Sequence, residues 1–309
     1  LYLKDGKQPV LEKIHFKQRS PYYDRKLKDG TEMRSIAQDN GYGVIFITYS
    51  NECALQDKGE DCLFCNINAT KNTYGEEQGI KWKTPVQIAE TVKSTYDDGF
   101  HHLTVSGGFI PERREVEYYL DVAENICDAL DADSFNGTAC VGAPDDLSVF
   151  EKYREAGFST VATNMEVWNE QLFNYICPGK SRRCGGRDNW LSALKEEVNV
   201  FGRNRVRSTF VAGLETKESL LDGISFLGSI GVIGVASAWY VNMGSALEGH
   251  RTPEDDWHFE VQERTADIYL SNGVSWAELR NATAESDTVA HDLYRWKADI
   301  RLDRMGREI

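Results

Sequence analysis

The sequence has little that would suit a membrane or a nucleic-acid partner. Its longest apolar runs fall well short of the ~20 residues that span a bilayer, so we expect no membrane partner. Basic side chains are outnumbered, because 35 Lys and Arg stand against 49 Asp and Glu and leave a formal net charge of −14. Nucleic-acid backbones require a basic surface, so no nucleic-acid partner is expected either, although Lys180 to Arg187 is a local basic stretch.

The sequence also lacks the features of a secreted, disulfide-bonded protein. It opens LYLKDGKQPVLEK, without the apolar segment of a signal peptide. Its seven cysteines are an odd number, so they cannot all pair with one another. We therefore expect a cytoplasmic protein whose thiols are reduced. No internal repeat, low-complexity tract or obvious linker divides the chain.

What the sequence does contain is a group of three cysteines, Cys53, Cys62 and Cys65, with C-x8-C-x2-C spacing. The group follows an apolar, β-branched run of strand length at 43–50 and precedes a helical pattern at 84–99. The cysteines therefore belong to a strand-to-helix loop, at the end of a strand where β/α barrels carry their catalytic groups. Three thiolates in one loop can hold three irons of a [4Fe–4S] cluster and leave the fourth iron for an exchangeable ligand.

Zinc is the alternative ligand for these cysteines. A C-x2-C pair is half of a common zinc site, and zinc usually takes four Cys or His ligands. The sequence has no second C-x2-C and no H-x3-H, and His101 and His102 lie in or beside the next predicted strand. A non-catalytic metal- or cluster-binding protein is therefore the competing class of function.

Strand-like and helix-like segments alternate from residue 41 onward. The strand candidates are 43–49, 102–106, 135–141, 159–165, 206–213 and 232–241, and the helix candidates are 84–99, 114–130, 145–157, 188–202 and 219–231. Six such units predict parallel strands in a β/α barrel, with a doubly wound open sheet as the alternative. We divide the chain into an N-terminal extension at 1–40, a barrel core at 41–255 and a C-terminal helical segment at 256–309 that completes or caps the barrel.

The cysteine loop resembles that of radical S-adenosylmethionine (SAM) enzymes. That family typically has C-x3-C-x2-C after its first barrel strand, with an aromatic residue before the third cysteine. This sequence has the C-x2-C half and the aromatic, Phe64, whereas its first spacer has eight residues instead of three. The resemblance implies an enzyme on a six-unit β/α core, possibly closed to eight, with a [4Fe–4S] cluster held by Cys53, Cys62 and Cys65.

The resemblance also implies the partners of that cluster. SAM would bind the open iron, a one-electron reductant of the flavodoxin or ferredoxin type would supply the electron, and a small molecule would be the substrate. Within the family, the sequence is most similar to the biotin-synthase-like branch, which serves cofactor and small-metabolite biosynthesis. Sulfur insertion is one reaction of that branch, and rearrangement or fragmentation of an amino-acid-like substrate is another.

Several residues at predicted strand ends match the SAM-binding positions of the family. Gly107 and Gly108 in SGGF would hold the methionine amine, although two glycines also suit a simple turn. Asn164 and Glu166 in NMEVW would hold the ribose hydroxyls, with helix capping as the alternative for Asn164. The ring of Phe64 would pack on the adenine.

Two later segments complete the expected site. Arg207 would pair with the SAM carboxylate, or else form a salt bridge on the barrel rim, and Gly213 would line the adenine. The segment YVNMGSALEGHRTP resembles an element of the biotin-synthase-like branch, and its His250 and Arg251 would reach the substrate unless they lie in a solvated loop.

Cys177 is the remaining candidate for a catalytic role. With Cys184 it could hold a second cluster, as in sulfur-inserting members of the family, or it could be a single active-site or buried thiol. In the second case the basic loop around it would bind an anionic substrate through Arg182, Arg183 and Arg187, and we expect this case, with one cluster. Cys127 falls on an apolar helix stripe and is expected in the core, and Cys140 ends a strand and could face the barrel interior.

Overall fold

A seven-stranded sheet forms the centre of the computed structural model, which describes residues 2–4, 10–13, 19–67, 82–303 and 307–309. Six strands are parallel and follow one another in chain order: β4 (Val44–Thr48), β5 (His102–Ser106), β6 (Gly137–Cys140), β7 (Thr160–Ala162), β8 (Val206–Ala212) and β9 (Val232–Ala238). The antiparallel strand β3 (Gln38–Asp39) adds to the free edge of β4. A separate hairpin pairs β1 (Tyr2–Lys4) with β2 (Val10–Lys13).

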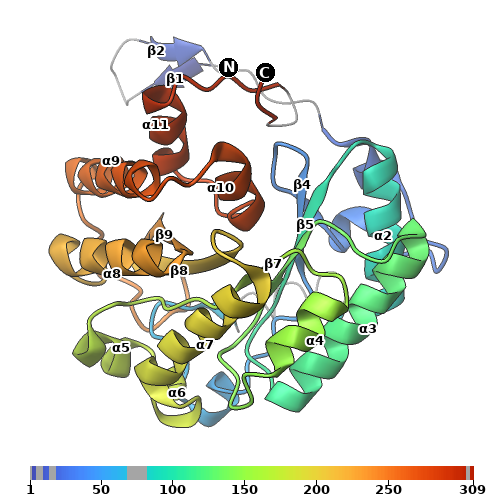
Figure 1. Cartoon of the computed structure of the whole chain (residues 1–309), viewed down its shortest axis with the longest axis horizontal. Coiled ribbons are helices and arrows are strands. Elements are labelled where there is room, and N and C mark those ends of the chain that lie inside the picture. Colours follow the sequence, from blue (N-terminus) through green and yellow to red (C-terminus); the bar gives the residue numbers. More distant parts are fainter. Residues whose placement is uncertain (1, 5–9, 14–18, 68–81, 304–306) are drawn as a thin grey trace.

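The strand order settles the fold class. A doubly wound sheet reverses its strand order partway across, whereas here β4 to β9 run in one direction without a reversal. The sheet curls with helices around its outer face, and β3 and β9 stay unpaired with each other (Figure 1). The predicted parallel β/α core is therefore confirmed as a half-barrel that is not closed.

Helices follow most of the strands. They are α2 (Pro85–Asp97), α3 (Glu112–Leu130), α4 (Val149–Glu155), α5 (Glu170–Ile176), α6 (Pro178–Arg183), α7 (Gly186–Phe201), α8 (Lys217–Ile230), α9 (Asp255–Ser271), α10 (Trp276–Ala282) and α11 (Val289–Lys297), with short 3-10 helices η1 (Pro21–Asp24), η2 (Met33–Ser35) and η3 (Gln56–Lys58). None of the helices in the described part of the chain has the length and hydropathy that a membrane crossing requires.

The start of α2 shows how local sequence fixes an element. Thr84 is the N-cap of this helix, and Pro85 is its first helical residue, a position that suits proline. The Thr84 hydroxyl accepts the Gln87 N–H at 3.2 Å, and the Gln87 side chain accepts the Thr84 N–H at 3.0 Å. This reciprocal capping box satisfies two otherwise unpaired backbone donors and begins the helix directly after the cysteine loop.

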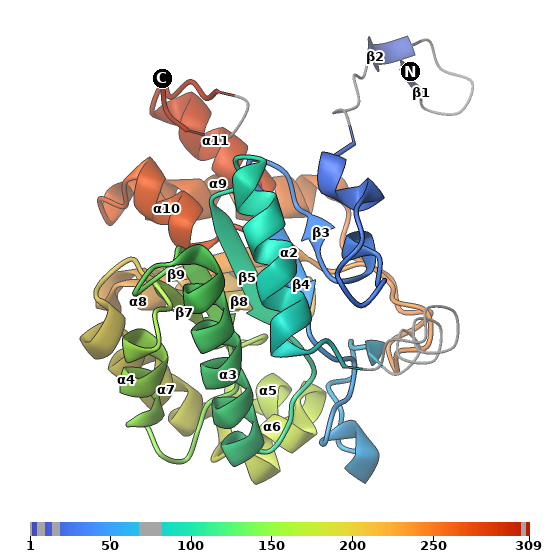
Figure 2. The same ribbon diagram turned by 90° about the vertical axis from the view of Figure 1, so that its right-hand side faces the viewer.

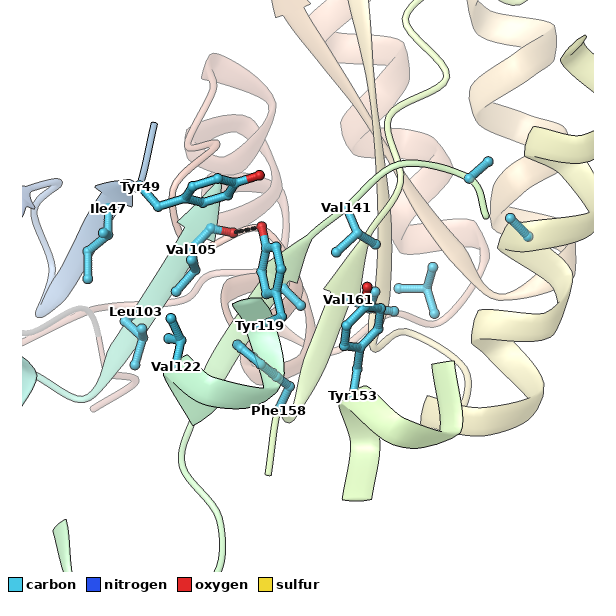
Figure 3. Close-up of a cluster of buried hydrophobic side chains, with 14 of the residues drawn as sticks. Ile47, Tyr49, Leu103, Val105, Tyr119, Val122, Val141, Tyr153, Phe158 and Val161 are labelled. Carbon is cyan, nitrogen blue, oxygen red and sulfur yellow. Dashed lines mark hydrogen bonds between the residues drawn. The ribbon is translucent and has the colours of Figure 1, made fainter. Parts of the chain in front are cut away.

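The main core lies between the outer face of the sheet and the helices. The buried side of α3, the helix predicted at 114–130, carries Tyr119, Val122 and Ile126 at helical spacing. Tyr119 packs among side chains of β5, β7 and α4, and its hydroxyl donates to the carbonyl oxygens of Val105 at 3.0 Å and Cys140 at 2.6 Å (Figure 3). The Tyr119 ring thus fills the core, and its hydroxyl joins the ends of β5 and β6, which lead into the pocket described below.

The C-terminal helices pack on the inner face of the last strand. Ile233 and Val235 of β9 lie on the same face as Arg207, and they form a second buried cluster with residues of α9, α10 and α11 such as Tyr269 and Leu279. Figure 2 shows α10 and α11 at the end of the molecule opposite α5 and α6. These helices cover the N-terminal part of the half-barrel and leave its other end free for a site.

The basic segment after residue 176 differs from expectation. It was expected to be a loop, whereas α6 spans most of it and α5 lies directly before. Both helices have only six or seven residues, which is too short for helical periodicity to appear in the sequence. Pro178 at the first position of α6 was the one local signal.

We predict that Glu197 makes folding stability fall as the pH rises from 5 to 8. This α7 carboxyl is buried and accepts a hydrogen bond from Thr163, and burial raises its pKa from 4.5 to about 8. The folded state therefore keeps the Glu197 proton at pH values where the unfolded chain has released it. The contribution of Glu197 to the free energy of unfolding is complete below pH 4.5, and it declines by about 1.4 kcal/mol per pH unit up to the folded pKa.

The test measures unfolding free energies by denaturant titration at pH 5 and pH 8. Glu197→Gln should gain stability relative to the wild type as the pH rises, because it has no proton to lose. Glu196→Gln, at a half-buried position of the same helix, should follow the wild type at both pH values. A constant difference between Glu197→Gln and the wild type would contradict a protonated Glu197.

Candidate functional site

A pocket of about 820 Å³, which includes space open to solvent, lies at the carboxyl ends of β4 to β7. Pockets at the carboxyl ends of parallel strands are where β/α proteins commonly bind small molecules. Its walls bring together most of the residues that the sequence singled out: Cys53, Cys62, Phe64, Cys65, Gly107, Gly108, Asn164 and Glu166. These residues come from three separate strand-to-helix loops, so only the fold makes them neighbours.

Backbone pairing carries the cysteine loop to the pocket wall. Beyond the ends of β4 and β5, the Gly108 N–H donates to the Ser50 carbonyl at 3.1 Å, and the Ala54 N–H donates to the Phe109 carbonyl at 2.7 Å. The two segments therefore continue side by side past the last paired residues of the strands. This arrangement fixes Cys53, the residue before Ala54, against the segment after β5.

The two glycines of that segment are required by this close approach. A Cβ atom at Gly107 would lie 2.4 Å from the ring of Tyr49, and one at Gly108 would lie 1.9 Å from the carbonyl oxygen of Glu52. No side chain fits at either position, so the pocket wall there is bare backbone. Such a wall can approach a ligand closely, and the expected contact with the SAM amine stays a prediction.

The long first spacer of the cysteine motif docks on α6. The Gly179 N–H donates to the Glu60 carbonyl at 2.9 Å, and the Glu60 side chain forms ion pairs with Arg182, at 3.2 Å, and with Arg183. The eight-residue spacer thus makes a supported turn that includes η3, and Cys62 returns to the same pocket as Cys53. Arg182 and Arg183 thus help to hold this turn, and their expected binding of an anionic substrate stays a prediction.

The cysteine side chains suit a metal cluster chemically. All three are free thiols, and hydrogen bonding to Cys177 together with burial raises the pKa of Cys62 well above its usual value. Burial also raises the pKa of Cys65 to about 12. Cys62 and Cys65 therefore stay protonated until a metal displaces their protons.

The donor set fits a [4Fe–4S] cluster on three cysteines, because all three thiols face one cavity with room left for a further ligand. Among the residues that the structure describes, no group of three or more His, Cys, Asp or Glu side chains is arranged to hold a metal ion. The thiols are thus gathered on one cavity wall without being drawn together around a single point.

Asn164 and Glu166 reach the pocket by a route that the sequence did not show. We expected a strand at 159–165, but β7 ends at Ala162, and Glu166 adopts a left-handed backbone with φ 65°. The Glu166 N–H donates to the Thr209 carbonyl at 2.9 Å, and the Glu166 carbonyl accepts from the Val211 N–H at 2.8 Å. Pairing with β8 therefore stabilises an unusual conformation that keeps both side chains in the pocket.

Lys180 is a pocket residue whose role sequence reasoning missed. Its ammonium group donates to a carboxylate oxygen of Glu166 at 2.8 Å and to the Asn164 carbonyl at 2.9 Å. It also lies 5.0 Å from the centre of the Trp190 ring. The basic stretch around Lys180 was visible in the sequence, but the turn of α6 that aims this one side chain inward was not.

Glu115 is the second pocket residue that was missed. It is buried in the first turn of α3, and its carboxyl accepts the Gly142 N–H at 3.2 Å. Burial raises its pKa to about 8, so it keeps its proton at neutral pH. A signal existed in the sequence, because Glu115 shares the apolar stripe of Tyr119, Val122 and Ile126.

Arg207 does not line the pocket. Its buried guanidinium pairs with Glu285, which lies between α10 and α11, and donates to the Thr209 hydroxyl at 2.7 Å. Glu285 also accepts from the Thr104 hydroxyl at 2.8 Å, so the pair bridges two strands inside the half-barrel. The structure therefore gives Arg207 a bridging contact, and its expected contact with SAM stays a prediction.

The segment after β9 reaches the cysteine loop, but its expected substrate residues do not line the pocket. The Leu247 N–H donates to the Leu63 carbonyl at 3.1 Å. His250 is exposed, as is Arg251, which pairs with Glu254. Both roles stay predictions.

Gly213 is also outside the pocket. Its φ of +121° favours glycine, and a Cβ there would lie 2.9 Å from Pro253. The expected contact of Gly213 with the adenine stays a prediction.

The remaining cysteines fall into two groups. Cys177 and Cys184 are buried at the two ends of α6, and the Cys177 thiol hydrogen-bonds with that of Cys62. Cys140 lines the pocket, and Cys127 packs against the core, as expected for both.

Arg187, the third arginine of the basic stretch, lies over the ring of Trp168 at 4.2 Å.

No model of a known protein family matches the chain. A curated relative, the bacteriochlorophyllide c C-7(1)-hydroxylase of Chlorobaculum limnaeum, is 27% identical over 260 residues, which cover 79% of this chain and 64% of the relative. The chain thus spans less than two thirds of that protein's length.

Two solved structures share the fold. HydG, a maturase of the [FeFe]-hydrogenase, has a TM-score of 0.54 and 17% identity, covering 82% of this chain and 53% of HydG. Methylornithine synthase (PylB) has a TM-score of 0.54 and 17% identity, covering 77% of this chain and 68% of PylB. At these identities the likeness concerns the fold, which is the partial barrel of radical SAM enzymes. The half-barrel, with three cysteines at its open end, therefore has the fold of these two proteins, and its sequence is similar to that of the Chlorobaculum limnaeum hydroxylase.

Proposed function

We propose that this protein cleaves SAM reductively and uses the resulting 5′-deoxyadenosyl radical to take hydrogen from a small-molecule or cofactor-precursor substrate in a biosynthetic pathway. The observation that supports this most directly is the shared pocket of Cys53, Cys62 and Cys65, which has a bare glycine wall and room for a ligand. When bound, the cluster and SAM would supply the electron transfer and the radical, so the protein's task is binding and orientation.

The pocket residues divide this task. The three thiols would hold the cluster, and the backbone of Gly107 and Gly108 would lie against the methionine end of SAM. The Phe64 ring, between two of the cysteines on the pocket wall, would stack on the adenine. Substrate would enter through the side of the pocket that is open to solvent, and a flavodoxin- or ferredoxin-type protein would deliver the electron.

The substrate class is inferred from the relative. The Chlorobaculum limnaeum relative is a hydroxylase of bacteriochlorophyllide c. We infer that this chain also acts on a C–H bond of an organic metabolite, which agrees with a role in cofactor biosynthesis. Its assignment to the biotin-synthase-like branch rests on the segment after β9.

Sulfur insertion, with a second cluster as the sulfur source, is the alternative reaction. Cys177 and Cys184 supply two buried thiols on either side of α6, which favours that alternative. The hydrogen bond between Cys177 and Cys62 argues for one cluster, because it places Cys177 beside the first cluster loop instead of in a site of its own.

The deciding experiment uses anaerobically reconstituted protein reduced with dithionite. Incubation with SAM should yield 5′-deoxyadenosine and methionine, measured by liquid chromatography. A protein that takes up iron but produces no 5′-deoxyadenosine would be a non-catalytic cluster-binding protein, and one that takes up zinc in place of iron would be a zinc protein. A substrate screen should accompany this measurement.

We predict that Cys62 and Cys65 hold oxygen-labile iron. Changing both to alanine should remove the bound iron and the visible charge-transfer absorbance, because too few thiolates remain for a cluster. Iron content and absorption spectra of the reconstituted proteins measure this. Cys127→Ala, which lies outside the pocket, serves as the control, and full iron content in the double variant would show that another site holds the cluster.

We predict that Phe64→Ala weakens SAM binding roughly threefold to tenfold while the cluster stays in place, since one stacked aromatic contact is lost. SAM affinity is measured by titration of the reconstituted protein, with iron content measured in parallel. Phe259→Ala, at an exposed position on α9, is the matched control. Unchanged affinity in a folded Phe64 variant would argue against this placement of the adenine.

We predict one cluster in each chain. Iron analysis of the reconstituted protein should give about four irons, whereas two clusters would give about eight. The Cys177→Ala/Cys184→Ala double variant should keep about four. A value near eight that falls to about four in the double variant would establish the auxiliary cluster and support sulfur insertion.

A further inference from the structure

A buried ion pair forms part of the pocket wall beside the cysteines. Lys180 and Glu166 are 2.8 Å apart, and their side chains are only 13% and 14% exposed. Lys180 is the only Lys or Arg among the described residues that line the pocket. The proposed function assigns no role to this ion pair. Burying two charges costs free energy unless each charge is paired and hydrogen-bonded.

Both charges are held firmly in place. A second N–H of Lys180 donates to the Asn164 carbonyl at 2.9 Å, and the Trp190 ring lies 5.0 Å from the ammonium group. Glu166 sits on a backbone that pairing with β8 fixes in the left-handed region. Contacts to Asn164, Trp190 and β8 therefore hold the pair in the pocket wall.

The ion pair also lies in the same pocket as the cysteine loop. Lys180 and Glu166 line this pocket together with Cys62 and Cys65. Lys180 is thus a cation, held by Glu166, in the wall of the cavity that would contain the cluster.

Fixed charges near an iron–sulfur cluster set its reduction potential, because reduction adds one negative charge to the cluster. A nearby cation stabilises the reduced form and raises the potential, whereas an anion lowers it. We propose that Lys180 and Glu166 are positioning residues that set the reduction potential of the [4Fe–4S] cluster, Lys180 raising it and Glu166 offsetting it. This inference rests on the proposed function, since it requires a cluster on the three cysteines.

The test is a redox titration of the reconstituted holoprotein without SAM, followed by electron paramagnetic resonance. Lys180→Met removes the cation at similar length and should make the midpoint potential more negative. Glu166→Gln removes the anion and should make it more positive. The double variant Lys180→Met/Glu166→Gln should lie between the two single variants. Shifts of opposite sign are the decisive result, because general loosening of the site would move both variants in one direction.

Two controls separate charge from packing. Lys195→Met changes an exposed lysine on α7 and should leave the potential at its wild-type value. Lys180→Arg keeps the charge and should also stay near that value. Potentials for Lys180→Met and Glu166→Gln that match Lys195→Met, or that shift together, would overturn the inference.

Iron content distinguishes the possible failures. If Lys180→Met loses its iron, Glu166→Gln decides alone, and an unchanged potential in that variant would overturn the inference. If wild-type protein binds no cluster, the proposed function itself fails and this inference fails with it. If the wild-type protein holds a full cluster but the variants have the wild-type potential, only the inference about the ion pair fails, and the proposed function stands.

Discussion

The site depends on one close approach of two backbone segments. The segment after β5 can pair with the cysteine loop only because Gly107 and Gly108 have no side chains, since a Cβ at Gly108 would overlap the backbone carbonyl of Glu52. A clash with backbone cannot be relieved by a rotamer change, so any larger residue would push the loop away from β5. Without that contact Ala54 would lose its hydrogen bond to the Phe109 carbonyl, and the neighbouring Cys53 would leave the pocket wall.

The unusual spacing of the cysteines has a structural counterpart in the short helices that precede α7. The extra residues between Cys53 and Cys62 form a turn that the Glu60 carbonyl and carboxylate fasten to α6. The same helix aims Lys180 into the pocket and places Cys177 against Cys62. The departure from C-x3-C-x2-C therefore changes what supports the cysteine loop, while all three thiols still reach one cavity.

Periodic parts of the chain could be predicted from the sequence, and contacts between distant parts could not. The apolar run at 102–106 became β5 with the same bounds, because a buried parallel strand needs a continuous apolar stretch. The cysteines, glycines and Asn164 were found because each follows a strand. In contrast, nothing local indicated that Glu285 would pair with Arg207, or that Glu166 would leave the strand conformation. These features arise from the packing of α10 and β8, which periodicity does not encode.

Burial also decides the charge of the pocket. The chain carries a net charge of −14, and Asp61, Glu115 and Glu166 all line the cavity that would receive three thiolates. Burial raises the pKa of Glu115 to about 8, so that carboxyl stays neutral at neutral pH, and Lys180 neutralises Glu166. Because Glu115 is neutral and Glu166 is paired, neither carboxyl repels the negative charge that thiolates and an added electron would bring. The fold thereby reconciles an acidic chain with a site that must accept further negative charge.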